Sequence, residues 1–575
     1  MKMRMAQVGT PVLVVTLLLH LAAFGSLAHA QDRYEDGMQY LDAEQYDDAI
    51  DAFNEVIRGN EGNALAHEGL GKAYLKQENY GEAQKKFRQA LSEDELLAGS
   101  HNGLGEVFMA QGLVGQALQK FNEAVKLERT NLEFLLNQGL ALAGVGDVKT
   151  AYDVLTKVLE TDPENAKVSN GRGRALTGLG RFDMAQADFA QAIYYEPTNE
   201  RYYVNSGMTY LAADDYPQAI AAFGAALQVD ARNRAEDTDD SLVEKPPFVE
   251  PLFYRAQAFV EIAKMSKLTG NKQTALQYAI DDCNRGLELL PGQANLLFLR
   301  GMSERMMDRY EDAVRSYSEA LQLQPESSEA YFRRGVVWYY LDEPDLALAD
   351  FDDAIENDYE DVRFYLWLGF THAKQEDYRE AVAAYSRAIS QNQPFARAYE
   401  SRGLAYLKLG DFDKALQDFN SVLRIEPNSP QAYTRRGATF LLMNNNDKAL
   451  RSFMAAIRID PDYVDAYRKA AEVNDLLGRR DRAAEFRQTA QELQQKKAEA
   501  PESDVADEPP VPSPDDVQML SPAGEASPLA DQPSLFDTPE SSGPKETNDE
   551  TDGIEADNPL GSDALPSDED IFGLP

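Results

Sequence analysis

The sequence predicts an all-α repeat protein, an α-solenoid of about 13 helix-turn-helix units. Glycine recurs at a constant step of thirty-four positions, in one run that begins at Gly37 and Gly71 and in a second that begins at Gly301 and Gly335. Twelve residues after each of these glycines stands an alanine, and four residues further on there is usually a large apolar residue. Spacings of three and four are the period of a helix with one apolar face, so each unit is predicted to be two amphipathic helices.

The glycine, alanine and aromatic positions have one physical explanation. Two antiparallel helices approach closely only where small residues remove side-chain bulk, and an aromatic residue four positions on fills the groove that this opens. A proline such as Pro197 or Pro427 closes several units at the point where the second helix must stop. One hairpin cannot bury its apolar face alone, so the units are expected to stack, with each touching only its neighbours.

Residues 1–30 have the three zones of an export signal. Lys2 and Arg4 precede an apolar run over 12–24, and Ala28-His29-Ala30 follows it. Cleavage is expected after Ala30, which would make the mature chain periplasmic or secreted, with no membrane span. The alternative is an uncleaved signal that anchors the protein in the membrane, and this too would place the repeats outside the cytoplasm.

Residues 31–231 hold repeats 1 to 6, and 232–251 form a polar, proline-containing linker. The hairpin at 252–290 is irregular, because the step from Ala256 to Gly301 is eleven positions longer than the regular step between repeats. It should protrude by about 8 Å beyond its neighbours. Its tip carries Lys264, Lys267 and Lys272, either as a solvated helix end or as a docking knob for an acidic partner or for the protein's own tail. Repeats 8 to 13 follow over 291–497 and end in a cap helix.

Residues 498–575 are predicted to be a disordered acidic tail. They hold 21 acidic residues against the single Lys545, and 13 of the 27 prolines of the chain. Three short apolar islands interrupt this composition, either as binding motifs or as drift in an unconstrained segment; they lie at 517–520, 534–537 and 568–575. The net charge of the whole chain is -41, which argues against a nucleic acid or an anionic membrane surface as the main ligand.

No catalytic, cofactor or metal site is predicted, so the protein is not expected to be an enzyme. Cys283 is the one cysteine of the chain, which excludes an internal disulfide and a cysteine-based metal site. His67 and His101 occupy equivalent places in consecutive repeats, but a metal site needs three or four convergent ligands. The two histidines are therefore interpreted as hairpin-packing residues.

The segment 398–429, AYESRGLAYLKLGDFDKALQDFNSVLRIEPNS, resembles the tetratricopeptide repeat family almost position by position, and the resemblance covers roughly 33–494. It implies a right-handed superhelix whose first helices line a concave face. The places that the family exposes there hold an apolar strip in the central repeats, either as a partner-binding groove or buried against the next unit by tight winding. The strip consists of Phe298, Met302, Met306, Phe332, Val336, Tyr339, Tyr340, Leu366 and Phe370.

These observations predict a non-enzymatic, exported scaffold that binds a peptide or a helix of another protein through its concave groove, in the cell envelope or periplasm. One alternative is an accessory subunit of an envelope glycan or peptidoglycan enzyme or of a secretion complex. Another is a groove occupied by the protein's own tail. Toward the N-terminus the same places carry a mixed polar surface, which consists of Glu68, Lys72, Lys76, Asn102 and Glu106.

Overall fold

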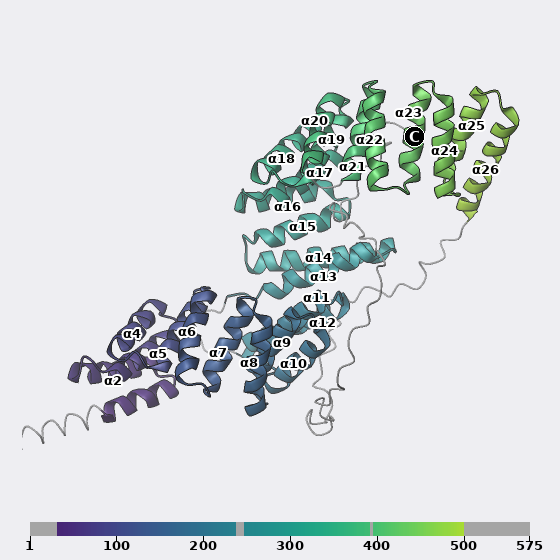
Figure 1. Cartoon of the computed structure of the whole chain (residues 1–575). Coiled ribbons are helices and arrows are strands. Elements are labelled where there is room, and N and C mark those ends of the chain that lie inside the picture. The colour runs from purple at the N-terminus through teal and green to yellow at the C-terminus, as the bar shows by residue number, and fades with distance from the viewer. Residues whose placement is uncertain (1–30, 237–245, 392–394, 500–575) are drawn as a thin grey trace, which may run out of the picture. The chain divides into compact units, whose positions relative to one another are not determined.

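The computed structural model describes residues 31–236, 246–391 and 395–499, and it confirms the all-helical repeat fold (Figure 1). The described helices pair as thirteen hairpins. They belong to two compact units, the first ending at residue 240 and the second beginning at residue 241. The predicted export signal and the predicted tail from residue 500 onward lie outside the described residues.

The first unit contains six hairpins. Within it, the helices in extensive contact are adjacent in sequence or separated by one helix. A helix over 31–42 precedes α2 (Tyr46–Gly59), α3 (Ala64–Lys76), α4 (Tyr80–Glu93), α5 (Ala98–Ala110), α6 (Val114–Leu127), α7 (Leu132–Gly144), α8 (Val148–Thr161), α9 (Ala166–Gly178), α10 (Phe182–Tyr195), α11 (Glu200–Ala212) and α12 (Tyr216–Glu236).

The second unit contains seven hairpins with the same pattern of neighbour contacts. Its helices are α13 (Glu250–Met265), α14 (Thr269–Leu289), α15 (Ala294–Met306), α16 (Tyr310–Leu323), α17 (Ser328–Tyr340), α18 (Pro344–Asn357), α19 (Val362–Lys374), α20 (Tyr378–Ser390), α21 (Ala396–Lys408), α22 (Phe412–Ile425), α23 (Pro430–Leu442), α24 (Asn446–Ile459), α25 (Val464–Leu476) and α26 (Arg480–Glu499).

The repeated glycines lie where the two helices of a hairpin are closest, as predicted. A Cβ atom added to Gly105 of α5 would stand 2.4 Å from Cε1 of Phe121, the aromatic residue of α6 in the same hairpin. The aromatic ring also contacts the next hairpin, because a Cβ atom on Gly103 would stand 2.2 Å from Cζ of Phe87 on α4. Each of these rings therefore packs between the two helices of its own hairpin and also against the first helix of the following hairpin.

The turn inside most hairpins uses one residue in the left-handed conformation, seven positions after the repeat glycine. Glycine occupies this place in some hairpins, as at Gly112 with φ of 74°, while Glu78, Asp342 and Asn444 occupy it in others. Glycine adopts this conformation without steric cost and other L-residues adopt it at a cost. The turn is thus the same throughout, although the sequence does not mark it with one residue type.

Four hairpins are also fastened by a two-bond ion pair between their helices. Arg334, one residue before the repeat glycine, donates from Nε and Nη2 to the two carboxylate oxygens of Asp350, at 2.8 and 2.7 Å. The same two places form such pairs three more times, as Arg172 with Asp188, Arg255 with Asp282, and Arg402 with Asp418. Where serine replaces the aspartate, Arg300 instead donates to the Ser316 hydroxyl.

The segment that links the two units begins later in the sequence than predicted. α12 continues to Glu236, five residues into the segment that was predicted to be a linker. Arg234 pairs with Asp230 one turn earlier, and Asn233 donates to the carbonyl of Thr198, so the added turn has its own contacts. Residues 237–245 lie outside the described part of the chain.

The irregular hairpin consists of two helices that are longer than the helices of a regular hairpin such as α17–α18. α13 has 16 residues and α14 has 21, where α17 and α18 have 13 and 14. Met265 ends α13 nine residues after Ala256, whereas Tyr340 ends α17 five residues after Gly335, so the extra length of α13 lies next to the turn. Cys283 is fully buried in α14, and burial raises the pKa of its thiol.

Candidate functional site

Five of the nine apolar residues predicted to line an exposed groove are buried. They are Phe332, Val336, Tyr339, Leu366 and Phe370, none of which exposes more than 3% of its surface. The expectation of an exposed strip is wrong for them, because α19 lies close enough to α17 for their side chains to interlock. The alternative that the sequence left open, burial against the next repeat, describes these five residues.

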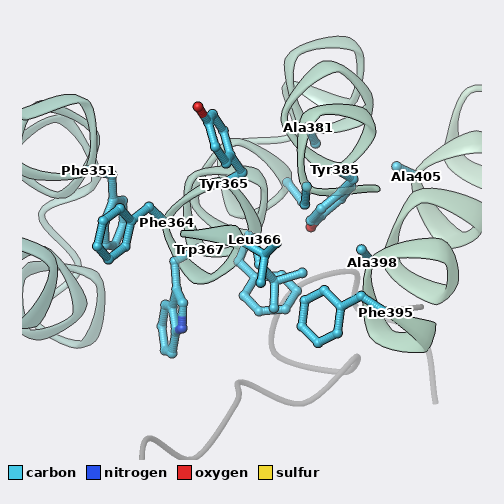
Figure 2. Close-up of a cluster of buried hydrophobic side chains, with 14 of the residues drawn as sticks. Phe351, Phe364, Tyr365, Leu366, Trp367, Ala381, Tyr385, Phe395, Ala398 and Ala405 are labelled. Atoms are coloured by element: carbon cyan, nitrogen blue, oxygen red, sulfur yellow. The ribbon is translucent and has the colours of Figure 1, made fainter. Parts of the chain in front are cut away.

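Phe332 shows how this burial arises. Its ring centroid lies 5.0 Å from that of Phe364 on α19 and 6.1 Å from that of Phe351 on α18. Trp367 is fully buried in the same cluster, and Figure 2 shows it projecting from the helix that also carries Phe364 and Leu366. Substituting Phe332 would therefore destabilise the central hairpins, so a loss of partner binding in such a variant could not be assigned to a lost contact.

The other four predicted residues are partly exposed. Phe298, Met302 and Met306 lie on α15, and Tyr340 lies at the end of α17. Tyr340 stacks on Tyr310 with centroids 5.7 Å apart and planes at 7°. The accessible part of the predicted strip is thus confined to α15 and the adjoining end of α17.

Phe298 and Met302 line a cavity of about 500 Å³ in the second unit. The cavity lies among α13, α15, the end of α16 and the start of α17. Its apolar lining includes Phe253, Ala294, Phe298, Leu299, Met302, Ala320 and Ala330, and its polar lining includes Gln257, Glu261, Lys264, Asn295, Gln324, Ser327 and Glu329. An apolar pocket with a few polar groups at its edge suits an apolar side chain presented on a peptide or helix.

The lengthened helix α13 extends one wall of this cavity. Lys264, which lies on the added part of α13, lines the cavity and pairs with Glu261 at 2.7 Å between Nζ and Oε1. Lys267 lies in the turn and Lys272 in the first turn of α14, and neither lines the cavity. The structure therefore brings one of the three predicted lysines together with the apolar residues of α15.

Several cations of the second unit lie over aromatic rings, and the sequence reasoning missed them. Two of them, Arg333 and Arg363, pair with Glu329, which lines the cavity. Arg363 on α19 lies 5.0 Å from the ring centroid of Phe332, and Lys374 lies 4.5 Å from that of Tyr339. Arg397 on α21 lies 5.6 Å from the centroid of Phe370. We use the name cationic strip for five residues: Arg333, Arg363, Lys374, Arg397 and Arg435. Arg363 and Arg397 stand one full repeat apart in the sequence, so their shared place in the repeat was the available signal.

Carboxylates within the strip are shared between arginines. Glu329 accepts hydrogen bonds from both Arg333 and Arg363, at 2.7 Å each. Glu400 accepts from Arg397 at 2.9 Å and also pairs with Arg435. Burial and the positive charge of Arg397 lower the pKa of Arg435 to about 10, so Arg435 remains charged at neutral pH.

The polar residues predicted on the first unit surround a second cavity, of about 530 Å³. Lys72 pairs with Glu68 at 2.8 Å, and Asn102 donates a 2.5 Å hydrogen bond to Glu106. Burial and the nearby Glu133 carboxylate raise the pKa of Glu106. Each of these four polar groups already has a hydrogen-bond or ion-pair partner within the unit. This cavity therefore offers a ligand fewer unpaired contacts than the apolar cavity on α15.

The two histidines that occupy equivalent places in consecutive repeats both contact the backbone. His67 and His101 each contact a backbone carbonyl six residues earlier, at 2.9 and 3.1 Å. Over 31–236, 246–391 and 395–499, no three His, Cys, Asp or Glu side chains converge as metal ligands would. In the same ranges, no helix combines the length and the apolar character that crossing a bilayer requires.

Models of the tetratricopeptide repeat match the sequence over most of the helical region. One matches residues 34–94, 69–131, 136–202, 298–358 and 371–430, and a second matches 200–233 and 430–463. The chain belongs to the tetratricopeptide repeat family. Repeats of this family typically mediate protein–protein interactions and are typically not catalytic. No curated protein matches the sequence of this tetratricopeptide protein.

Several solved structures are similar to parts of this tetratricopeptide protein. YrrB, described as a TPR protein with an unusual peptide-binding site, is 25% identical, with a TM-score of 0.29 over 32% of this chain and 95% of YrrB. PilF of Pseudomonas aeruginosa is 21% identical, with a TM-score of 0.31 over 36% of this chain and 97% of its own. Yeast Tom70 is 18% identical, with a TM-score of 0.32 over 75% and 92% of the two chains.

Proposed function

We propose that this tetratricopeptide protein is a non-enzymatic scaffold that binds a protein partner through the cavity between α13, α15 and α17. The observation that carries the proposal is the presence of partly exposed Phe298 and Met302 in a cavity of about 500 Å³. Aromatic and methionine side chains adapt to varied apolar partners, and a groove between helices accepts a peptide or an amphipathic helix.

The proposed place of action is the cell envelope or periplasm. This part of the proposal is supported by the sequence of residues 1–30 alone, with its basic start, its short apolar run and the Ala28-His29-Ala30 motif. N-terminal sequencing of the protein recovered from its host tests it. A mature chain that begins at Gln31 in the envelope fraction is expected, and a full-length chain in the cytosol would contradict export.

A photo-crosslinking amino acid at Met302 tests the cavity. We expect it to yield adducts with a discrete partner in intact cells, and the same probe at Leu346 on α18, which is 46% exposed, serves as the control. Gln257 is exposed on α13 at the cavity edge, so Gln257→Trp should fill the entrance without disturbing the core and remove the Met302 adducts. Equal adducts from both probes, or adducts that persist in Gln257→Trp, would contradict the proposal.

A further inference from the structure

Five consecutive first helices of the second unit, α15 to α23, carry an excess of positive charge in a strongly acidic protein. Together α15, α17, α19, α21 and α23 carry eleven Arg and Lys residues and three Glu residues, with no Asp. By contrast, α18 carries five acidic residues and no cation, and the whole chain has a net charge of -41. Four of these five helices, α17, α19, α21 and α23, carry the residues of the cationic strip, and the acidic helix α18 follows the first of them.

The cationic strip combines this positive charge with aromatic surface. Four of its five cations, all but Arg435, lie over the rings of Phe332, Tyr339 and Phe370, while Tyr340 on α17 is partly exposed. Two carboxylates beside the strip, those of Glu329 and Glu400, each pair with two of its arginines. The strip side chains expose between 10% and 28% of their surface, so a ligand would meet only their exposed edges. A ligand that supplies carboxylates beside apolar side chains would fit these edges, because charge-assisted hydrogen bonds and ring contacts would form together.

We propose that the cationic strip binds the C-terminal segment of the same chain, residues 568–575. The sequence of this segment is DEDIFGLP: three consecutive acidic residues, followed by the apolar Ile571 and Phe572. The other two apolar islands are less acidic. The island at 517–520 contains no acidic residue, and the island at 534–537 contains one. The inference rests on the proposed function only in that both concern the second unit.

The chain is long enough for this contact. Residues 500–567 connect α26, the last helix of the same unit, to the segment. The acidic, proline-rich composition of this connection predicts a flexible chain. A flexible chain of this length would have a root-mean-square end-to-end distance of about 45 Å and would keep the segment at an effective concentration of order 1 mM or below. Modest intrinsic affinity is then enough for docking, and a partner that competes for the same surface would have to displace the tail.

Crosslinking within the full-length protein tests the inference. A photo-crosslinking amino acid at Phe572 is expected to form intramolecular adducts with α17, α19, α21 or α23. The same probe at Phe536, in the island at 534–537, is the matched control and should give at least about fivefold fewer adducts. Raising the salt from about 0.1 M to about 1 M should weaken the Phe572 adducts, because the contact is largely electrostatic.

Two sets of substitutions separate binding from folding. Neutralising Asp568, Glu569 and Asp570 as Asn, Gln and Asn changes only residues beyond α26, and it should reduce the Phe572 adducts by about fivefold or more. Lys374→Gln removes one strip cation whose carboxylate partner, Asp342, is mostly exposed, and it should reduce them about two- to fivefold. Lys414→Gln on α22, where the lysine pairs with Asp411, is the control and should leave them unchanged.

Several outcomes would overturn the inference. Equal adducts from Phe572 and Phe536, adducts on other helices, adducts between two copies, or adducts insensitive to neutralisation would each show that the segment does not dock on the strip of its own chain. Partner adducts from Met302 are measured in the same preparations. If those adducts persist while the Phe572 adducts fail, the inference falls and the proposed function stands.

Discussion

Single glycines set the distance between the two helices of a hairpin, and the α5–α6 hairpin allows this to be tested with a matched pair. A Cβ atom added to Gly105 would stand 2.4 Å from the Phe121 ring, whereas one added to Gly115 would have nothing within 4 Å. Gly105→Ala should destabilise the hairpin by about 1–3 kcal/mol, because the ring must move. Gly115→Ala should stabilise it by about 0.4–1 kcal/mol, because alanine restricts the unfolded chain.

Hydrogen exchange of α5 and α6 amides in the full chain measures both changes. Faster exchange in Gly105→Ala together with unchanged or slower exchange in Gly115→Ala is the expected result. Similar protection in the two variants would mean that the helices have room to separate, and that the glycine is not needed for their close approach.

Glu106 should make the stability of the first unit depend on pH. Burial and Glu133 raise its pKa in the folded state, so between its unfolded value of about 4.3 and its folded value the folded protein holds more protons than the unfolded one. The free energy of unfolding therefore falls as the pH rises through this window. Glu106→Gln keeps an oxygen acceptor for Asn102 and removes the titration.

The comparison is the thermal midpoint of wild type and Glu106→Gln from about pH 3 to pH 7. At the acid end both side chains are neutral and the two midpoints should be similar. Toward neutrality the Gln variant should gain stability relative to wild type. A difference that stays constant or narrows with rising pH would contradict the direction of the pKa shift.

At the residue level, the sequence allowed the glycine–aromatic contacts to be predicted and left the turn residues undetected. Gly105 and Phe121 recur with fixed types and fixed spacing, so their contact follows from periodicity. The left-handed turn residue also has a fixed place, but it is Gly112 in one hairpin, Glu78 in another and Asn444 in a third. A backbone conformation that several residue types can adopt leaves no single-letter pattern in one sequence.

At the level of elements, the ion pairs between paired helices offer a second test. Asp350 is almost fully buried and joins α18 to Arg334 of α17, whose side chain is 20% exposed. Asp350→Asn should cost about 1–3 kcal/mol, because it leaves a partly buried guanidinium with a weaker partner. Asp353→Asn, on the same helix at an exposed position, should change stability by less than about 0.5 kcal/mol.

Tryptophan fluorescence reports this change directly. The two tryptophans of the chain, Trp338 and Trp367, lie on α17 and α19, on either side of α18 in sequence. The urea midpoint of the fluorescence change should fall for Asp350→Asn and remain near the wild-type value for Asp353→Asn. Equal midpoints for the two variants would show that the ion pair does not stabilise the hairpin.

The candidate site shows where sequence periodicity stops being informative about elements. Repeat spacing identified Phe332 and Phe370 as residues of the first-helix face, and the structure has them on α17 and α19. Whether such residues meet solvent depends on how far apart successive first helices lie, and side chains as large as Trp367 decide that distance by interlocking. The cavity on α15 could not be predicted, because residues from several hairpins at unequal repeat places form it. The repeat spacing of Arg363 and Arg397 marked part of the cationic strip, but the rings beneath the cations are known only from the packing.

At the scale of the whole molecule, stability should be local, because the helices in extensive contact are adjacent in sequence or separated by one helix. In such an array each repeat is supported by its own hairpin and by its neighbours, so a lesion should spread by one or two hairpins. The destabilising Gly105→Ala variant provides the test in the intact chain, since its site is in α5 and the second unit begins beyond residue 240.

Hydrogen exchange should accelerate in α4 to α7 of Gly105→Ala and should remain at wild-type rates in α17 to α23. The physical reason is that the altered joint between Gly105 and Phe121 contacts only the adjoining hairpins, while the aromatic cluster around Trp367 has no residue from the first unit among its members. Faster exchange in α17 to α23 would contradict neighbour-only coupling. It would require that the two units unfold as one cooperative body, in which case substitutions in the first unit would also affect binding at the cavity on α15.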